Sequence, residues 1–152
     1  MSMEHVTILL VEDDSVDATA VKRSFRQLRI ANPLVEARNG IEALAHLRGE
    51  DGHAAIPAPC LVLLDLNMPR MDGLEFLVHL RDDPVLHSTQ VIVLTTSNAE
   101  EDRIRAYEQN IAGYVLKHDS AQNFPDTIGV LAAYWRLIKF PPPDRQAMMS
   151  QM

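Results

Sequence analysis

Short apolar runs alternate along this chain with amphipathic segments, and this alternation limits the possible folds more than any other feature of the sequence. Several runs are apolar at consecutive positions, as required for strands that helices cover on both faces. Strands that alternate with helices are typical of an α/β fold with a parallel sheet. The sequence predicts strands at Val6–Val11, Leu34–Ala37, Leu61–Leu64, Val91–Leu94 and Tyr114–Leu116.

Residues that often cap helix N-termini follow most of these strands. Their side-chain oxygens can accept hydrogen bonds from the free N–H groups of a first helical turn, so each predicts that a helix starts there. Residues 49–58 contain Gly and Pro and predict a long surface loop before the third strand. The predicted caps are Asp14 or Ser15, Asn39 together with Glu42, Ser97 or Asn98, and Asp119 or Ser120.

The length of 152 residues suits one domain with one sizeable core. We expect the domain to span residues 1–140 and a Pro-rich, flexible tail to span residues 141–152, because the PPP run cannot continue a helix. The formal net charge of −7 argues against nucleic acid as a partner, and no apolar segment reaches the ~18 residues of a membrane span. The sequence therefore predicts a cytoplasmic protein that binds neither nucleic acid nor a membrane.

Polar residues stand at the carboxyl ends of four predicted strands. Glu12 and Asp13 follow the first strand, Asp65 follows the third, Thr95 follows the fourth and Lys117 follows the fifth. In open parallel sheets, ligands bind outside these strand ends, where the strand order reverses. In a doubly wound sheet of order 2-1-3-4-5 the first and third strands are neighbours, so the three carboxylates are expected to form one acidic pocket.

Three carboxylates this close repel one another unless one is protonated or a cation binds between them. An open acidic pocket suits Mg²⁺, which takes few protein carboxylates and keeps several waters, and Mn²⁺ is an alternative. With such a cation, Asp65 is placed as the nucleophile of a phosphoryl transfer, and Lys117 and Thr95 as contacts to the phosphoryl group. Each residue alone is weak evidence, because an Asp after a strand is often only a helix cap. The hypothesis depends on their joint occurrence.

Four motifs resemble, in order and spacing, the receiver domains of two-component response regulators: LLVEDD at 9–14, LLDLNMPRMDG at 63–73, VLTTS at 93–97 and GYVLK at 113–117. The resemblance covers residues 6–140. It implies a flavodoxin-like (βα)5 domain with an extended C-terminal helix. It also implies a phosphoprotein of a phosphorelay, not an enzyme, that takes a phosphoryl group on Asp65 from a sensor histidine kinase.

The resemblance also implies roles in metal binding. Glu12 and Asp13 match the acidic pair, with Asp13 as a direct Mg²⁺ ligand, and Asp65 matches the phosphorylated aspartate. Asn67 matches the residue whose backbone carbonyl binds the metal. These four residues are the metal ligands that the resemblance predicts.

Further matches concern the switch that reports phosphorylation. Thr95 matches the switch hydroxyl, Lys117 the phosphate-binding lysine, and Tyr114 the aromatic residue whose ring moves inward after phosphorylation. In such proteins this movement remodels the face formed by the fourth helix, the fifth strand and the fifth helix. His118 stands where the family usually has Pro, which leaves the shape of the following loop open.

The segment 123–140 is apolar on two sides at helical spacing, although one side suffices to cover a sheet. The second side predicts contact with a copy of the same chain across a two-fold axis, so we expect a homodimer; shielding by the PPP tail is the alternative. The first side carries Phe124, Ile128, Leu131, Trp135 and Ile138, and the second carries Val130, Tyr134 and Leu137.

The long loop, the extended last helix and the missing output domain resemble the stand-alone regulators paired with phytochrome-type histidine kinases. A bacteriophytochrome is therefore the candidate kinase, and another histidine kinase stays open. Two other functions also stay open: a receiver fold that binds partners without phosphorylation, and a small aspartate-nucleophile phosphatase of the haloacid-dehalogenase type. The phosphatase pattern has a second Asp where this chain has Asn67.

Overall fold

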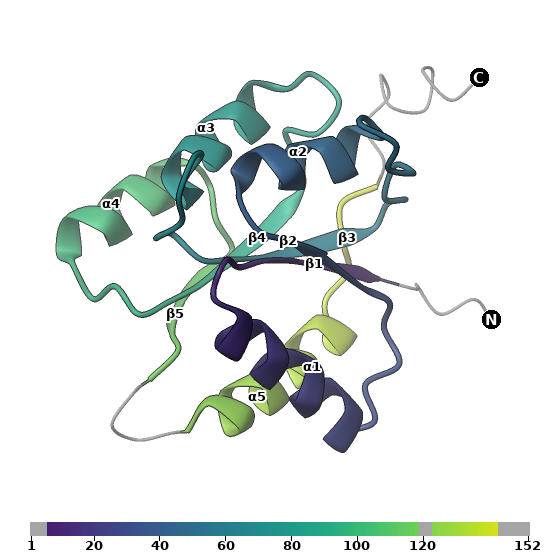
Figure 1. Ribbon diagram of the computed structural model, residues 1–152, viewed down its shortest axis with the longest axis vertical. Helices are drawn as coiled ribbons and strands as arrows, with labels where there is room; N and C mark the ends of the chain where they lie inside the picture. Colours follow the sequence, from purple (N-terminus) through teal and green to yellow (C-terminus); the bar gives the residue numbers. More distant parts are fainter. Residues whose placement is uncertain (1–5, 119–122, 143–152) are drawn as a thin grey trace.

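The computed structural model describes residues 6–118 and 123–142, and in them five parallel strands form one sheet (Figure 1). The strand order is β2-β1-β3-β4-β5, so the order reverses between β1 and β3, and the predicted doubly wound topology is confirmed. The strands are β1 (Thr7–Val11), β2 (Leu34–Ala37), β3 (Cys60–Leu64), β4 (Gln90–Thr95) and β5 (Gly113–Leu116). Each begins and ends within one residue of its predicted range.

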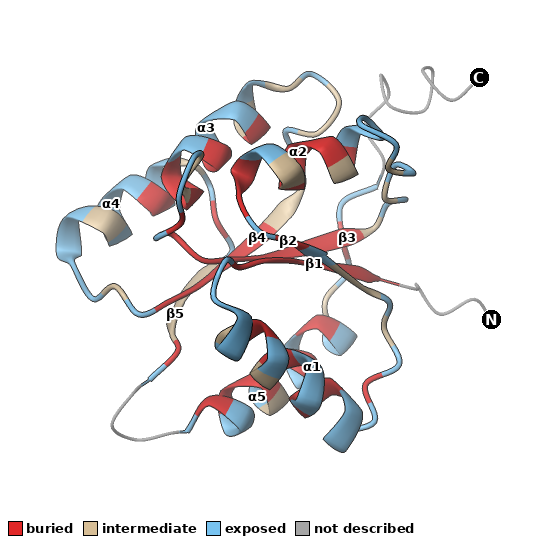
Figure 2. Ribbon diagram, viewed as in Figure 1, coloured by how far each residue is buried: buried red, intermediate tan, exposed pale blue. Residues whose placement is uncertain are grey.

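Helices cover both faces of the sheet (Figure 1). On one face α1 (Ser15–Gln27) contacts α5 (Phe124–Leu137), and on the other α2 (Gly40–Arg48) contacts α3 (Gly73–Asp82), which contacts α4 (Glu100–Glu108). Each face has its own cluster of buried apolar side chains. All residues of β1 and β3 are buried, as consecutive apolar positions require, whereas the edge strand β5 is only partly buried (Figure 2).

Two of the predicted helix caps are present. The Asp14 side chain accepts hydrogen bonds from the N–H groups of Val16 and Asp17 at the start of α1. The Asn39 side chain accepts a hydrogen bond from the Glu42 N–H at the start of α2. In both cases a strand therefore leads directly into a helix whose first turn lies beside the carboxyl edge of the sheet.

The predicted cap of α4 was wrong. Ala99 occupies the cap position and no side chain caps the helix there. The Ser97 hydroxyl lies two residues before the cap position, where it donates to the Asp102 side chain at 2.6 Å and accepts from the Ala99 N–H at 3.4 Å. For α5, the predicted residues 119 and 120 lie outside the described part of the chain, and Asn123 caps the helix.

The long loop before β3 is present as predicted. It follows Gly49, which ends α2 in the left-handed region with a φ of 73°. The loop, the α3–β4 connection and residues 140–142 line a cavity of about 400 Å³ beside the first residues of β3 and β4. Residues 143–152 of the expected tail lie outside the described residues. No helix within residues 6–118 and 123–142 is both long and apolar enough to cross a membrane.

Candidate functional site

The strand ends place the predicted site residues at one edge of the sheet. Glu12 directly follows β1 and Asp65 directly follows β3, and these two strands pair along their whole length. The pairing continues one step beyond the strands, since the Asp65 N–H donates to the Val11 carbonyl at 3.0 Å. Thr95 ends β4, and the Lys117 N–H donates to the Thr95 carbonyl at 2.9 Å. Side chains distant in sequence therefore meet at this edge.

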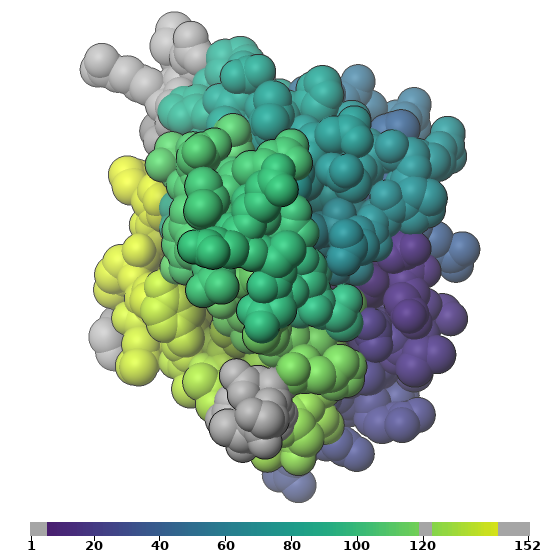
Figure 3. Space-filling view, turned by 90° about the vertical axis from the view of Figure 1, so that its left-hand side faces the viewer, coloured from purple at the N-terminus to yellow at the C-terminus, as the bar shows by residue number. Residues whose placement is uncertain are grey.

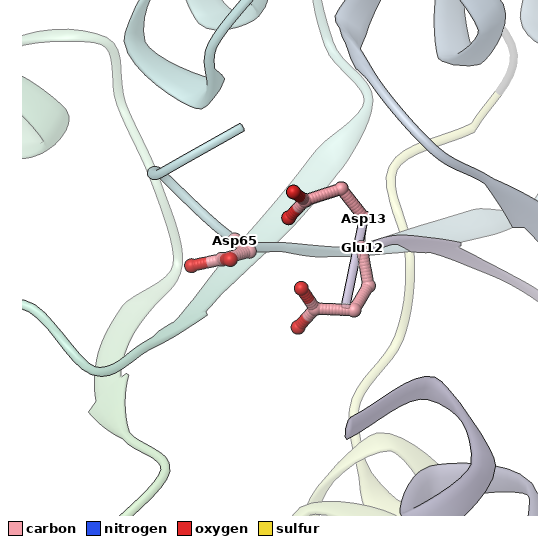
Figure 4. Close-up of side chains that lie close together, drawn as sticks. All are labelled: Glu12, Asp13 and Asp65. Atoms are coloured by element: carbon pink, nitrogen blue, oxygen red, sulfur yellow. The ribbon is translucent and has the colours of Figure 1, made fainter. Parts of the chain in front are cut away.

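Glu12, Asp13 and Asp65 lie close together there (Figure 4). Each offers one carboxylate oxygen, and these three atoms lie within 4.8 Å of one another. Glu12 and Asp65 are buried, whereas Asp13 is exposed, so the group is open to solvent on one side. Asp65 Oδ1 is buried and has no hydrogen-bond partner among the described residues, an arrangement that costs free energy unless a donor or a cation satisfies the oxygen. This set of oxygens fits a hard divalent cation such as Mg²⁺.

Lys117 lies within this acidic cluster and is only 2% exposed. Its Nζ atom donates to the carboxylates of Glu12 and Asp17, the latter at 2.8 Å, and lies 3.6 Å from Asp65 Oδ2. Burial acts to lower the pKa of Lys117, but the hydrogen bonds to Asp17 and Glu12 and the charge of Asp65 outweigh burial and raise its pKa. The site therefore contains one charged ammonium surrounded by carboxylates.

The charge of Glu12 depends on this environment. Burial is the main cause that raises the pKa of Glu12 from 4.5 to about 7; the hydrogen bond from Lys117 opposes the rise, and the charge of Asp65 adds to it. Without a cation, the Glu12 carboxyl group is therefore partly protonated at neutral pH. A divalent cation bound beside it would favour the ionised form.

Thr95 and Tyr114, the two predicted switch residues, both contact Ser97. The Thr95 side chain is fully buried, and its hydroxyl oxygen accepts a hydrogen bond from the Ser97 N–H at 3.3 Å. The Tyr114 hydroxyl donates to the Ser97 carbonyl at 2.8 Å, and its partly buried ring packs against the core. Burial raises the pKa of Tyr114. One short backbone segment thus links the end of β4 to the aromatic ring on β5.

The connection that follows Asp65 packs tightly against the start of α3. At Gly73 an added Cβ atom would lie 2.5 Å from the Asp65 carbonyl oxygen and 2.8 Å from the Leu66 Cα atom. Only glycine fits there without movement of the backbone that positions Asp65. Asn67 is exposed in this connection, and metal binding by its carbonyl stays a prediction. The sequence motif contains Gly73 but does not show this close approach.

Asp17 is the site residue that sequence reasoning missed. It lies in the first turn of α1 and accepts the 2.8 Å hydrogen bond from Lys117. Acidic residues are common in first turns, where they interact favourably with the helix dipole, so the pattern gave no signal of a second role. His118 is exposed and its ring contacts Phe124, whereas the loop at 119–122 lies outside the described residues.

Comparison with known proteins gives consistent matches. The model of the response regulator receiver domain family matches residues 8–128. Response regulator Rcp1 from Synechocystis sp. is 34% identical over 128 residues, which cover 84% of this chain and 87% of Rcp1. The crystal structure of the Mn²⁺-bound form of Rcp1 has a TM-score of 0.80 and 32% identity, covering 91% of this chain and 100% of that chain. The crystal structure of the phosphorylated cyanobacterial phytochrome response regulator RcpA has a TM-score of 0.82 and 31% identity, with the same coverage.

The family match runs from β1 into α5 and includes the acidic cluster at the carboxyl edge of the sheet. The strand order agrees with the one that the receiver resemblance implied. This chain therefore belongs to the response regulator receiver domain family.

Proposed function

We propose that this chain is a response regulator in which Asp65 accepts a phosphoryl group from the phosphohistidine of a sensor histidine kinase. One observation carries the proposal. The Asp65 carboxylate is buried, its Oδ1 atom has no hydrogen-bond partner among the described residues, and Lys117 and two further carboxylates lie beside it. An oxygen in this state is available as a nucleophile.

In the transfer, an Asp65 oxygen forms a bond to phosphorus while the bond from phosphorus to the kinase histidine nitrogen breaks. Lys117, whose ammonium lies 3.6 Å from Asp65 Oδ2, offers charge to the phosphoryl oxygens, and the Thr95 hydroxyl is a further donor. Glu12, Asp13, Asp65 and the Asn67 carbonyl would bind Mg²⁺ or Mn²⁺. When bound, the cation supplies positive charge that offsets the charge on the transferring oxygens.

Phosphorylation would change the contacts of Thr95. Its hydroxyl now accepts from the Ser97 N–H, and a phosphoryl group on Asp65 adds a negative acceptor for that hydroxyl. Since Tyr114 donates to the Ser97 carbonyl, movement of this segment would alter the position of the ring. This is a shift between two populations that one local charge drives, and its effect reaches the surface around α4, β5 and α5.

We propose homodimerisation through α5. The first side of the helix is buried against the sheet, whereas the second side is left open. The alternative is that the PPP run shields this second side, but the two residues of the run that follow Phe140 and are described, 141–142, line the cavity beside β3 and β4. Both α4 and α5 reach the surface on the face shown in Figure 3, and α4 adds two exposed apolar residues. The exposed fractions are 58% for Val130, 43% for Tyr134 and 83% for Leu137 on α5, and 53% for Ile104 and 49% for Tyr107 on α4.

The similarity to RcpA, a phytochrome response regulator, supports a bacteriophytochrome as the partner kinase. We further propose that the output runs through protein contacts, because the net charge of −7 does not favour nucleic acid. A histidine kinase phosphorylates its partner in the cytoplasm, where we expect this chain to act.

Phosphorylation can be tested with acetyl phosphate and Mg²⁺ by following the intact mass, with Asp65→Asn and EDTA as controls. We expect a gain of one phosphoryl group in the wild-type protein and none in either control. No gain with acetyl phosphate or with phosphorylated candidate kinases would favour a binding module that works without phosphorylation. Steady release of phosphate from a generic ester would favour the phosphatase.

A further inference from the structure

The contacts of the Lys117 ammonium divide into two kinds. Glu12 and Asp65 belong to the group of carboxylates that fits a cation, whereas Asp17 does not. Asp17 reaches Lys117 from α1, and its side chain is 22% exposed. The hydrogen bond to Asp17 measures 2.8 Å, and the distance from Nζ to Asp65 Oδ2 is 3.6 Å. Lys117 is therefore hydrogen-bonded to Asp17 on α1, whereas its distance to Asp65 is too long for a hydrogen bond.

A buried ammonium needs hydrogen-bond acceptors for its three N–H groups. Once the oxygens of Glu12 serve a divalent cation, they are weaker acceptors for Lys117, and Asp17 is the carboxylate in contact that carries no metal-binding role. Without Asp17, the Asp65 carboxylate, whose Oδ2 atom lies 3.6 Å from Nζ, is an alternative acceptor. A lysine bound to Asp65 would occupy the oxygen that a cation and a phosphoryl group require.

We propose that Asp17 is a positioning residue that keeps Lys117 away from Asp65, so that the carboxylates can bind a divalent cation. This inference depends on the proposed function, because it assigns Asp17 to the same phosphoacceptor site. It explains why a buried site with one ammonium contains a fourth carboxylate that lies outside the metal-binding group.

The test measures binding of Mn²⁺ alone to the full, unphosphorylated chain by electron paramagnetic resonance. Asp17→Asn keeps the shape of the side chain but removes its charge, and we expect it to weaken Mn²⁺ binding about three- to tenfold. Asp17→Glu should restore most of the affinity. Asp14→Asn is the matched control, because it removes a neighbouring charge and Asn is an equally good N-cap; its effect should be about twofold or less.

A double-mutant cycle separates positioning from direct attraction between Asp17 and the cation. If Asp17 acts through the lysine, Asp17→Asn in a Lys117→Met background should weaken Mn²⁺ binding no more than Asp14→Asn does. Two outcomes would overturn this inference and leave the proposed function standing. In one, Asp17→Asn weakens Mn²⁺ binding equally in both backgrounds; in the other, Asp17→Asn weakens Mn²⁺ binding of the wild-type protein no more than Asp14→Asn does. Absence of saturable Mn²⁺ binding by the wild-type protein would overturn the proposed metal site and the inference with it.

Discussion

Glu12 is the residue whose protonation links this site to pH. Its pKa is raised from 4.5 to about 7 in the folded protein, chiefly by burial, so the folded state binds this proton more tightly than the unfolded chain. Its contribution to stability is therefore complete below about pH 4.5 and is lost as pH rises through about 7. Relative to Glu12→Gln, which cannot titrate, the metal-free wild-type protein should gain on the order of 3 kcal/mol in free energy of unfolding between about pH 8 and pH 4.5.

Urea unfolding of both proteins in EDTA, at a series of pH values, checks this prediction. The comparison uses the difference between the two proteins, because other carboxylates also change the stability of each one with pH. A difference that stays constant over this range would show that Glu12 is already ionised in the metal-free protein at acidic pH.

We expect the Asp65 carboxylate to lower the free energy of unfolding of the metal-free protein, although phosphorylation requires it. Its buried carboxylate lies near Glu12 and Asp13, and a single ammonium offsets their charges together with that of Asp17. Asp65→Asn removes one negative charge, so we expect the metal-free protein to gain about 1 kcal/mol in free energy of unfolding while phosphorylation is abolished. The matched control is Asp126→Asn, a change at an exposed residue of α5, which should change stability by less than about 0.5 kcal/mol. Lower stability of Asp65→Asn in urea unfolding would contradict the prediction.

At the level of the elements, the next prediction concerns Gly73 at the start of α3. Gly73→Ala places a Cβ atom 2.5 Å from the Asp65 carbonyl oxygen, so the helix start or the Asp65 backbone must move. We expect a loss of about 1–3 kcal/mol in free energy of unfolding and slower phosphorylation by acetyl phosphate. Gly129→Ala is the control: its Cβ atom has ordinary contact with Leu28 at 3.6 Å, and Ala favours helix, so stability should rise by about 0.5–1 kcal/mol. Normal stability and phosphorylation of Gly73→Ala would show that the close approach is not needed.

Local patterns predicted the elements well because the signals for strands and caps lie within a few residues. The apolar run at 61–64 indicates β3, and Asn39 with Glu42 marks the start of α2. The cap of α4 was predicted wrongly, because the helix starts two residues later than Ser97, after Ala99, and the local backbone geometry that decides this is not given by the sequence.

Contacts between distant elements could not be predicted in this way. Arg81 on α3 donates to the carbonyls of His87 and Thr89 and, from the same guanidinium, to those of Gln109 and Asn110 at the end of α4. The bond of Asp17 to Lys117 likewise joins residues 100 positions apart. The acidic pocket was predictable because the rule for parallel sheets places strand ends together, but no such rule covers the first turn of α1.

At the scale of the whole molecule, the proposed homodimer would form against the electrostatic repulsion between two negatively charged chains. Each chain carries a formal net charge of −7, so two copies repel at low ionic strength, whereas the exposed apolar side of α5 favours association. Salt screens the repulsion and does not weaken apolar burial. We therefore expect the dimer to become tighter as sodium chloride rises from about 0.02 M to about 0.3 M, which sedimentation velocity can measure. A dimer that dissociates with added salt would indicate an interface formed by ion pairs instead.

The variant that tests this interface is Leu137→Glu. Leu137 is 83% exposed, so a charged side chain there should cost the folded monomer little free energy. In the proposed dimer the same charge would be buried against the equivalent residue or other apolar groups of the second chain. We expect it to weaken dimerisation at least about tenfold with less than about 0.5 kcal/mol change in the free energy of unfolding of the monomer. Val78→Glu is the control, since Val78 on α3 is 44% exposed and lies on the opposite side of the sheet from α5, so it should leave the dimer intact. A wild-type protein that stays monomeric at high micromolar concentration would refute the interface, and equal weakening by both variants would place the interface elsewhere than on α5.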